Sequence, residues 1–172
     1  DSLIIEAVGE DPKREGLLET PRRFAEMVAE QLAYAAVPNE EIARAFDKTF
    51  SSPESDMVVV KDISLFSHCE HHIALMYNMK AAVGYIPRGR VIGLSKIARI
   101  ADAVSKRLQI QERIGADIRD IMERITGAGD VIVLLEGEHS CMTARGIRKP
   151  GTLTRTISAS GRFRTCLLYT SD

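Results

Sequence analysis

Two short segments of the chain concentrate side chains that bind metals and transfer protons. The first is Ser-His-Cys-Glu-His-His at 67–72, and the second is His-Ser-Cys at 139–141. Cys69 and His72 are three residues apart, so a single turn of backbone can direct both side chains to the same metal ion. Taken alone, a Cys-x-x-His pair is equally compatible with a polar turn between two strands.

The second segment supplies a third ligand. Residues i and i+2 of a strand share a face, so we expect His139 and Cys141 to point into the same space. If the sheet brings this strand end to the turn after Cys69, then Cys69, His72 and Cys141 can bind zinc with two thiolates and one imidazole. Three protein ligands leave one position for water, whose pKa zinc lowers to about 7.

Three further histidines flank these ligands. His71 and His139 remain beside the predicted metal, where an imidazole that is not a ligand can transfer protons. The alternative is a closed structural zinc site, in which one of these two histidines is the fourth ligand. We interpret His68 as a solvated flank, because adjacent residues on an extended chain point in opposite directions.

Basic residues gather at the predicted start of a helix. Lys96 and Arg99 are three residues apart in its first turn, and we expect Ser95 to cap it. Cations oppose the positive end of the helix dipole unless an anion binds there, and a phosphate fits the free N–H groups of a helix N-terminus. Arg145 can add a planar fork to the same anion. The alternative for two charges alone is a solvated helix face.

Gln111 and Glu112 open the next predicted helix. A glutamate in the first turn ordinarily compensates the helix dipole. A carboxylate in this place can also accept two hydrogen bonds from guanine, one from N1–H and one from the 2-amino group. The residues alone leave both interpretations open.

The elements that must position these residues follow from hydrophobic periodicity. Helical spacing begins at Thr20-Pro21, as cap and first helical residue, and a second short helix is capped by Asn39. Beyond these we predict strands at 57–66, 80–87, 131–139 and 152–163. Between the second and third strands lie two helices; the first buries Ile97, Ile100, Ala101, Val104 and Leu108, and the second buries Ile110, Ile114, Ile118, Ile121, Met122 and Ile125 and ends at Gly127. This order favours an α+β fold, a four-stranded antiparallel sheet with helices on one face.

Composition restricts the class of protein. The chain has 172 residues, 45% of them hydrophobic and 27% charged, as in an ordinary globular domain. The net charge of −1 argues against a nucleic-acid binder, and no apolar run approaches the length of about 20 residues that crosses a membrane. Three cysteines do not make a disulfide framework, so we expect a cytoplasmic protein. From the charge and the lack of a long apolar run, we expect it to bind neither nucleic acid nor membrane.

We divide the chain into an N-terminal helical segment at 1–50, a catalytic domain at 51–164 and a tail at 165–172. The tail, TCLLYTSD, breaks the preceding pattern, and we interpret it as non-native, with Cys166 outside the functional set. The first residue is Asp1, so we expect the natural start to lie upstream.

Several segments, in order along the chain, resemble the GTP cyclohydrolase I family. The resemblance runs from about Gly9 to Phe163, nearly the whole chain before the tail. The segments that carry it are GEDPKREGLLETPRR at 9–23, CEHH at 69–72, YIP at 85–87, VIGLSKIARI at 91–100, QIQER at 109–113 and HSCMTARGI at 139–147.

The resemblance implies a reaction. GTP and water become 7,8-dihydroneopterin triphosphate and formate, the first step toward folate or tetrahydrobiopterin. Cys69, His72 and Cys141 would bind Zn²⁺, and the water on the zinc would attack C8 of the guanine ring. His71 and His139 would transfer protons during ring opening, formate release and the later sugar rearrangement.

The resemblance also implies a substrate site and an assembly. Glu112 and Gln111 would bind the guanine edge of GTP. The residues that would bind the ribose triphosphate are Ser95, Lys96, Arg99, Arg145 and Arg23. The fold would be the tunnelling fold, assembled as a homodecamer of two stacked pentamers with sites at subunit interfaces.

The sequence departs from the family pattern in two places. Met79 stands where a glycine is expected, in a segment at 73–80 with one residue extra, so we expect an altered loop beside the metal ligands. The helix expected after Phe163 is missing from the sequence pattern. An inactive homologue is therefore one alternative. The others are a structural-zinc binding module and a nitrile oxidoreductase of queuosine biosynthesis, which shares the fold but lacks paired zinc thiolates.

Overall fold

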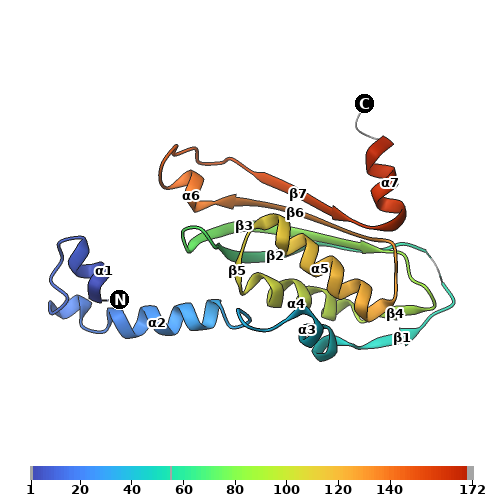
Figure 1. Cartoon of the computed structure of the whole chain (residues 1–172), viewed down its shortest axis with the longest axis horizontal. Helices are drawn as coiled ribbons and strands as arrows, with labels where there is room; N and C mark the ends of the chain where they lie inside the picture. Colours follow the sequence, from blue (N-terminus) through green and yellow to red (C-terminus); the bar gives the residue numbers. More distant parts are fainter. Residues whose placement is uncertain (1, 55, 170–172) are drawn as a thin grey trace. The chain divides into compact units, whose positions relative to one another are not determined.

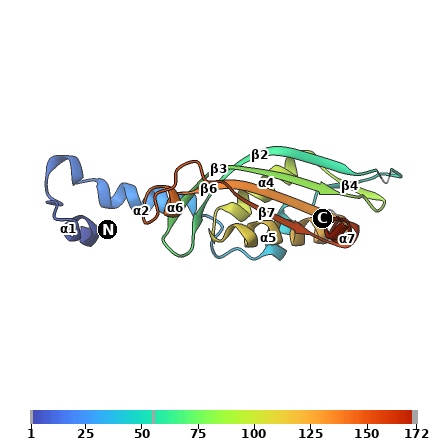
Figure 2. The ribbon, with the colours of Figure 1, turned by 90° about the horizontal axis from the view of Figure 1, so that it is seen from above.

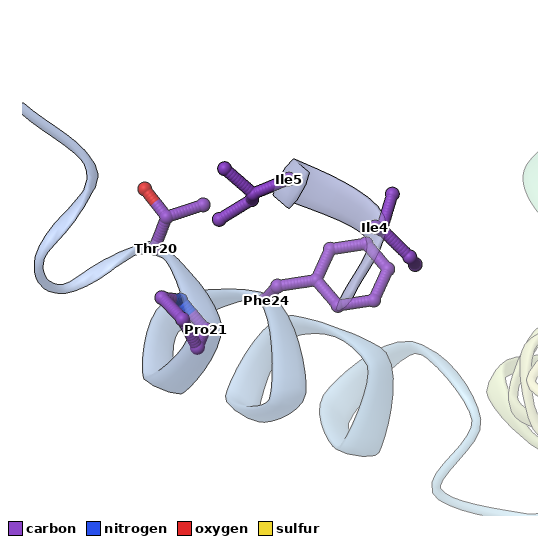
Figure 3. A pocket seen from close by; sticks show the side chains of 5 residues that line it. All are labelled: Ile4, Ile5, Thr20, Pro21 and Phe24. Atoms are coloured by element: carbon purple, nitrogen blue, oxygen red, sulfur yellow. The ribbon is translucent and has the colours of Figure 1, made fainter. Parts of the chain in front are cut away.

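The computed structural model describes residues 2–54 and 56–169. The chain divides into two compact units, with the boundary in sequence between Ala33 and Tyr34. The first unit contains α1 (Ser2–Ala7), the short 3-10 helix η1 (Glu15–Leu17) and α2 (Thr20–Gln31). Ile4 and Ile5 of α1 face Phe24 of α2 across a small apolar pocket (Figure 3).

The predicted start of α2 is shifted by one residue. Glu19, rather than Thr20, occupies the N-cap, and Thr20 is the first helical residue. Pro21 is tolerated in the first turn because the N–H groups there have no partner within the helix.

The second unit holds a mixed set of helices and strands (Figure 1). Its helices are α3 (Asn39–Phe46), α4 (Leu94–Ser105), α5 (Gln111–Thr126), α6 (Ser140–Thr143) and α7 (Gly161–Tyr169). Its strands are β1 (Thr49–Ser51), β2 (Val58–Cys69), β3 (Ala74–Tyr85), β4 (Arg90–Ile92), β5 (Leu108–Gln109), β6 (Val131–His139) and β7 (Thr154–Ala159). The predicted α+β class is confirmed.

The main sheet has the strand order β5-β2-β3-β6-β7. Neighbouring strands from β2 to β7 are antiparallel, and the two-residue strand β5 lies parallel to β2 at the edge. A separate ribbon pairs β1 with β4. The predicted sheet had four antiparallel strands; the structure adds these three short strands, which are too short to show a hydrophobic period.

Helices α4 and α5 lie side by side and pack on the sheet, α4 against β2 and α5 against β6 and β7 (Figures 1 and 2). Their apolar stripes, including Ile97, Ile100, Ile114 and Ile118, are fully buried. Leu108 was predicted on the buried face of the first helix, and this is wrong: α4 ends at Ser105, and Leu108 lies in β5 with 37% of its surface exposed. Gly127 ends α5 in the left-handed conformation, as predicted.

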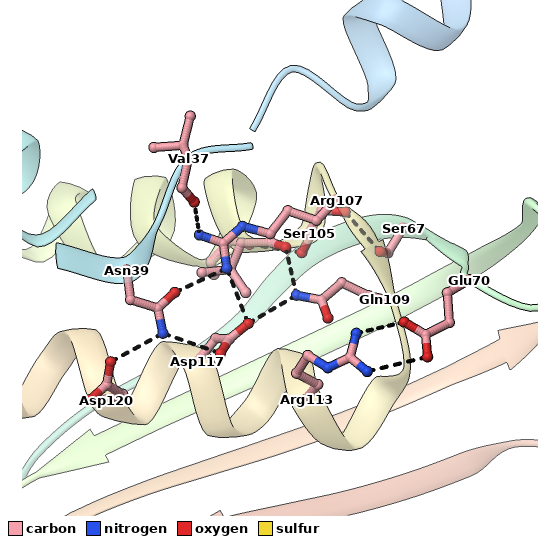
Figure 4. A network of polar contacts seen from close by, with 12 residues as sticks. Val37, Asn39, Ser67, Glu70, Ser105, Arg107, Gln109, Arg113, Asp117 and Asp120 are labelled. Carbon is pink, nitrogen blue, oxygen red and sulfur yellow. Dashed lines mark hydrogen bonds and ion pairs between the residues drawn. The ribbon is translucent and has the colours of Figure 1, made fainter. Parts of the chain in front are cut away.

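The predicted caps of α3 and α4 are also wrong. Pro38 and Gly93 precede these helices, and neither helix has a side-chain cap, so Asn39 and Ser95 lie in the first turns. The Asn39 amide instead donates hydrogen bonds to Asp117 and Asp120 on α5 (Figure 4). These two hydrogen bonds connect α3 to α5 within the second unit. The domain bounds expected from the sequence remain a prediction.

The segment at 73–80 is strand from Ala74 onward rather than an altered loop. Strand β3 begins at Ala74, and a bulge at Asn78, with φ of 50°, shifts the register to β6 between Tyr77 and Lys80. Met79 is 1% exposed and packs against Gly137 of β6. The extra residue is therefore absorbed by a bulge.

A helix does follow the last strand, contrary to the sequence prediction. Gly161, with φ of 54°, turns the chain from β7 into α7. The Arg162 N–H donates to Asp130 Oδ1 at 2.8 Å, so this carboxylate stabilises the first turn of the helix. The end of the predicted tail, 170–172, lies outside the described residues. No helix in the described part of the chain is long and apolar enough to span a bilayer.

Candidate metal centre

The hairpin of β2 and β3 delivers the first two predicted ligands. Cys69 is the last residue of β2 and pairs with Ala74, so residues 70–73 form the connecting turn. The turn closes through the Ile73 N–H, which donates to the Cys69 carbonyl at 2.9 Å, and Ile73 adopts φ of 50°. His72 is thereby folded back toward Cys69.

The third predicted ligand, Cys141, follows strand β6. Its last residue, His139, pairs with Met76 near the start of β3, so the chain leaves β6 beside the hairpin turn. Cys141 does not continue the strand: it lies in α6, and the expectation that His139 and Cys141 share one strand face is wrong. The helical turn nevertheless directs Cys141 toward Cys69.

Together these elements build a compact group of potential ligands. One ligand atom from each of Cys69, His72 and Cys141 lies within 4.8 Å of the other two. The Cys69 Sγ and His72 Nδ1 atoms are 3.5 Å apart. Cys69 is 4% exposed, Cys141 is partly buried and His72 is exposed, so the group is open to solvent on one side.

The donor set fits a divalent transition metal. Burial and the neighbouring Cys69 thiol raise the pKa of Cys141, because two thiolates side by side repel each other. A bound cation would reverse this effect by stabilising both thiolates. Two sulfurs and one imidazole suit a borderline-soft ion, and Mg²⁺ or Ca²⁺ would require oxygen ligands.

Two histidines without a place in this group lie close to it. The His139 ring is half-buried, and its Nε2 atom is 2.8 Å from Gln111 Oε1. Burial lowers the pKa of His139, an effect that the nearby Glu112 carboxylate opposes. His71 is exposed, with its ring centroid 6.3 Å from that of His72.

His68 was predicted to be a solvated flank, and this is wrong. It is 8% exposed, because β2 continues through it and pairs with Leu75 on one side and Leu108 on the other. Burial lowers the pKa of this imidazole.

The two residues that open α5 differ in exposure. Gln111 is 1% exposed, and its side-chain amide donates to the carbonyl oxygens of Leu135 and Thr154. Glu112 is exposed in the first turn. Glu112 is therefore free to contact a ligand, whereas Gln111 already has partners within the chain.

Arg145 lies at the metal centre. This exposed side chain places Nη1 3.2 Å from His72 Nε2. Its guanidinium carries a fixed positive charge beside the group of ligands.

The other predicted anion-binding residues lie elsewhere in the chain. Helix α4 follows β4, whose residue Ile92 donates its N–H to the Tyr85 hydroxyl. Tyr85 is the last residue of β3, at the opposite end of that strand from the turn that joins Cys69 to Ala74. Helix α4 ends just before β5, which pairs with Cys69. Ser95 and Lys96 thus lie in the first turn of a 12-residue helix, about 18 Å long, at the end away from β5, and Arg99 lies near its middle.

That Arg145 and Lys96 contact one anion stays a prediction, because the two side chains have separate contacts within the chain. Lys96 instead lies over the Phe46 ring, with Nζ 5.8 Å from its centroid. Arg23 is exposed on α2 of the first unit.

One ion pair beside the centre was missed by the sequence reasoning. Glu70, in the turn between the ligands, accepts hydrogen bonds from Arg113 at 2.6 and 3.2 Å (Figure 4). The Glu70 N–H also donates to the Gln109 carbonyl. Arg113 follows Glu112 on α5, so the pair ties the ligand turn to the start of that helix. The presence of both residues in the motifs CEHH and QIQER was the available signal.

Comparison with known proteins gives a consistent result. The family model for GTP cyclohydrolase I matches residues 2–167. The chain is 57% identical over 166 residues to GTP cyclohydrolase 1 of Clostridium acetobutylicum, covering 94% of this chain and 85% of that one. It is 56% identical over 168 residues to the protein of the same name from Clostridium botulinum strain Kyoto, covering 94% and 86%.

Among solved structures, the archaeosine synthase QueF-Like in its apo form aligns with a TM-score of 0.49 and 18% identity, over 64% of this chain and 96% of that one. This structural likeness is too weak to support a conclusion, and the family assignment depends on the sequence matches alone. With a match over nearly its whole length and relatives more than half identical, the chain belongs to the GTP cyclohydrolase I family of enzymes.

Proposed function

We propose that this enzyme opens the imidazole ring of GTP with water, giving 7,8-dihydroneopterin triphosphate and formate. The observation that carries the proposal is the meeting of Cys69, His72 and Cys141 within 4.8 Å of one another in a chain of this family. Cys69 and His72 come from one segment and Cys141 from another that is distant in sequence, and the fold brings the three side chains together.

We propose Zn²⁺ as the metal, held by these three side chains. Zinc with three protein ligands supplies Lewis acidity at its remaining position, which makes water a nucleophile near neutral pH. Cys69 anchors the group from the buried side, and His72 and the neighbouring Arg145 line its exposed side. Arg145 gives this side a positive charge that favours an anionic substrate.

His139 and His71 are proposed to move the protons of the reaction. Ring opening, formate release and rearrangement of the sugar each require a proton to be taken from one atom and delivered to another. Because burial lowers the pKa of His139, its neutral form is favoured near neutral pH, as a proton acceptor requires. His71, exposed beside His72, is placed to exchange protons with solvent.

Glu112 is proposed to accept the N1–H and 2-amino hydrogens of guanine. Glu112 is exposed, and its negative charge opposes the lowering of the His139 pKa, so the two side chains are near each other. A guanine ring bound by Glu112 would therefore lie near the histidine that is proposed to transfer protons. Gln111 is left out of this contact because it is buried.

The triphosphate is proposed to bind across two copies of the chain. Ser95 and Lys96 lie in the first turn of α4, at the end away from β5, and Arg99 lies near its middle, so we propose that they complete the site of a neighbouring copy, alongside Arg145 of that copy. β7 pairs with β6 alone among the described strands, which leaves an edge for a further strand. The tunnelling fold and its homodecamer satisfy both conditions. The roles of Arg23, the folate or tetrahydrobiopterin pathway and a cytoplasmic location remain predictions.

Incubation of the purified protein with GTP tests the proposal. We expect stoichiometric formate and a pterin that becomes fluorescent on oxidation, without any nicotinamide. A zinc chelator should abolish both products, and added zinc should restore them. A binding module or an inactive homologue would release no formate from GTP. Activity that survives complete removal of the metal would refute the proposal.

A further inference from the structure

The buried amide of Gln111 contacts three strand residues and the side chain of His139. Its Nε2 atom donates to the Leu135 carbonyl at 3.2 Å, to the Thr154 carbonyl at 2.9 Å and to the Thr156 hydroxyl at 3.3 Å. Its Oε1 atom lies 2.8 Å from His139 Nε2. The proposed function uses none of these contacts.

The two backbone carbonyls determine which way the amide faces. A carbonyl oxygen only accepts hydrogen bonds, so the NH₂ group must point toward Leu135 and Thr154. The opposite orientation would place Oε1 against two acceptors and leave a buried oxygen unsatisfied, which costs free energy. The Gln111 oxygen is therefore the atom that faces His139.

The same logic applies to the imidazole. An amide oxygen cannot donate, so the hydrogen in the short contact belongs to His139 Nε2. In a neutral ring the other nitrogen, Nδ1, then has a free lone pair. Among the described residues, the contact with Gln111 is the single hydrogen bond of this ring.

We propose that Gln111 is a positioning residue that fixes the orientation of the His139 ring and its Nε2–H tautomer, which leaves Nδ1 as the nitrogen with a free lone pair. This inference rests on the proposed function, in which His139 transfers protons. It gives the glutamine a different task from the adjacent Glu112, which is exposed and is proposed to bind guanine.

The strands make this orientation rigid. Leu135 lies four residues before His139 on β6, and Thr154 and Thr156 lie on the neighbouring strand β7. Gln111 is the first residue of α5, so its backbone is fixed by the helix while its amide is fixed by the sheet. Little freedom is left for the imidazole to rotate, which is what a proton-transfer group with one active nitrogen needs.

Steady-state kinetics with GTP test the proposal, using Gln111→Met as the variant that keeps size and removes both polar ends. We expect kcat to fall about 10- to 100-fold, with KM for GTP changed less than about 2-fold. In a His139→Ala background, the same replacement should cause no further loss, because its effect passes through the imidazole. A raised KM with unchanged kcat, or a full additional loss in the His139→Ala background, would overturn the proposal.

Thr156→Val is the matched control. It removes one acceptor of the Gln111 amide and leaves both carbonyls and His139 in place. We expect kcat within about 2-fold of the parent, since the amide orientation is retained. A loss as large as that of Gln111→Met would show that the network only supports the fold, and would overturn the proposal. Zinc content measured for each variant separates loss of the metal from loss of proton transfer.

A second measurement needs no replacement of Gln111. Magic-angle-spinning NMR of the parent protein labelled with ¹⁵N-histidine distinguishes the two tautomers, and the His139 signals are assigned by their loss in His139→Ala. We expect a protonated Nε2 and an unprotonated Nδ1 above neutral pH, and a protonated Nδ1 would overturn the proposal. Full activity of His139→Ala would instead refute the role of His139 in the proposed reaction. The tautomer measurement would then still decide whether Gln111 fixes the protonated nitrogen of this ring.

Discussion

Replacing Gly137 with alanine would test how β3 accommodates its extra residue. An added Cβ at Gly137 would lie 2.6 Å from Met79 Cγ, 3.4 Å from its Cβ and 3.5 Å from its Cα. Carbon atoms in a packed core approach to about 3.5–4.0 Å, so Met79 must move, yet it is 1% exposed and lies beside the bulge at Asn78.

The expected cost can be estimated from these contacts. Overpacking of a well-packed site costs about 1–3 kcal/mol. The new methyl group also lowers the conformational entropy of the unfolded chain, which stabilises the folded state by about 0.4–1 kcal/mol. We therefore expect Gly137→Ala to lower the free energy of unfolding by about 1–2 kcal/mol. Combining it with Met79→Ala should make the alanine at 137 nearly harmless, a coupling of at least about 1 kcal/mol.

Urea unfolding at one fixed protein concentration measures these differences, because an oligomer's apparent stability depends on concentration. Gly93→Ala is the control: its added Cβ would meet no atom nearer than 3.8 Å, so we expect a change within about 0.5 kcal/mol. Equal stability of Gly137→Ala and the parent, or strictly additive effects in the double variant, would refute the packing argument.

Three further predictions concern the turn between Cys69 and Ala74, the last helix and the proposed phosphate-binding residues. Glu70→Gln, which breaks the ion pair with Arg113, should leave the free energy of unfolding nearly unchanged, because the pair is exposed. It should lower zinc affinity about 10-fold, measured by competition with a chelator; unchanged affinity would show that the pair does not position the turn. The hydrogen bond from the Arg162 N–H and the nearby arginine charges lower the pKa of Asp130, so its ionised form stabilises the fold above its unfolded pKa of about 4, and this contribution is lost as pH falls through the lower folded pKa. Asp130→Asn should therefore shift the urea midpoint near pH 7 and shift it progressively less below about pH 4; a difference that is constant with pH would contradict this. Lys96→Ala should raise KM for GTP about 10- to 100-fold and affect turnover of guanosine far less, and equal effects on the two substrates would remove Lys96 from the phosphate site.

The meeting of Cys69, His72 and Cys141 could be predicted because much of it depends on short-range geometry. Cys69 and His72 belong to one turn, and Cys141 closely follows a strand whose bounds, 131–139, the periodicity identified correctly. The local structure at Cys141 could not be predicted in the same way, because a helix of four residues has no period of its own.

The rest depended on tertiary contacts that no local pattern records. The two residues of β5 bury His68 from the side, so its exposure could not be judged from neighbours in sequence. The burial of Gln111 follows from the meeting of α5 with β6 and β7. The separation of Lys96 from the metal centre follows from the direction of α4, which sequence motifs do not encode.

The central claim, a metal held by three side chains with one position open, is tested most directly by X-ray absorption at the zinc edge of the purified protein. We expect one zinc per chain, with two sulfur ligands at about 2.3 Å, a single imidazole and one further light atom from solvent. In Cys141→Ser the zinc should be lost. Two imidazoles on the metal, or full activity in protein that holds no zinc, would contradict the account.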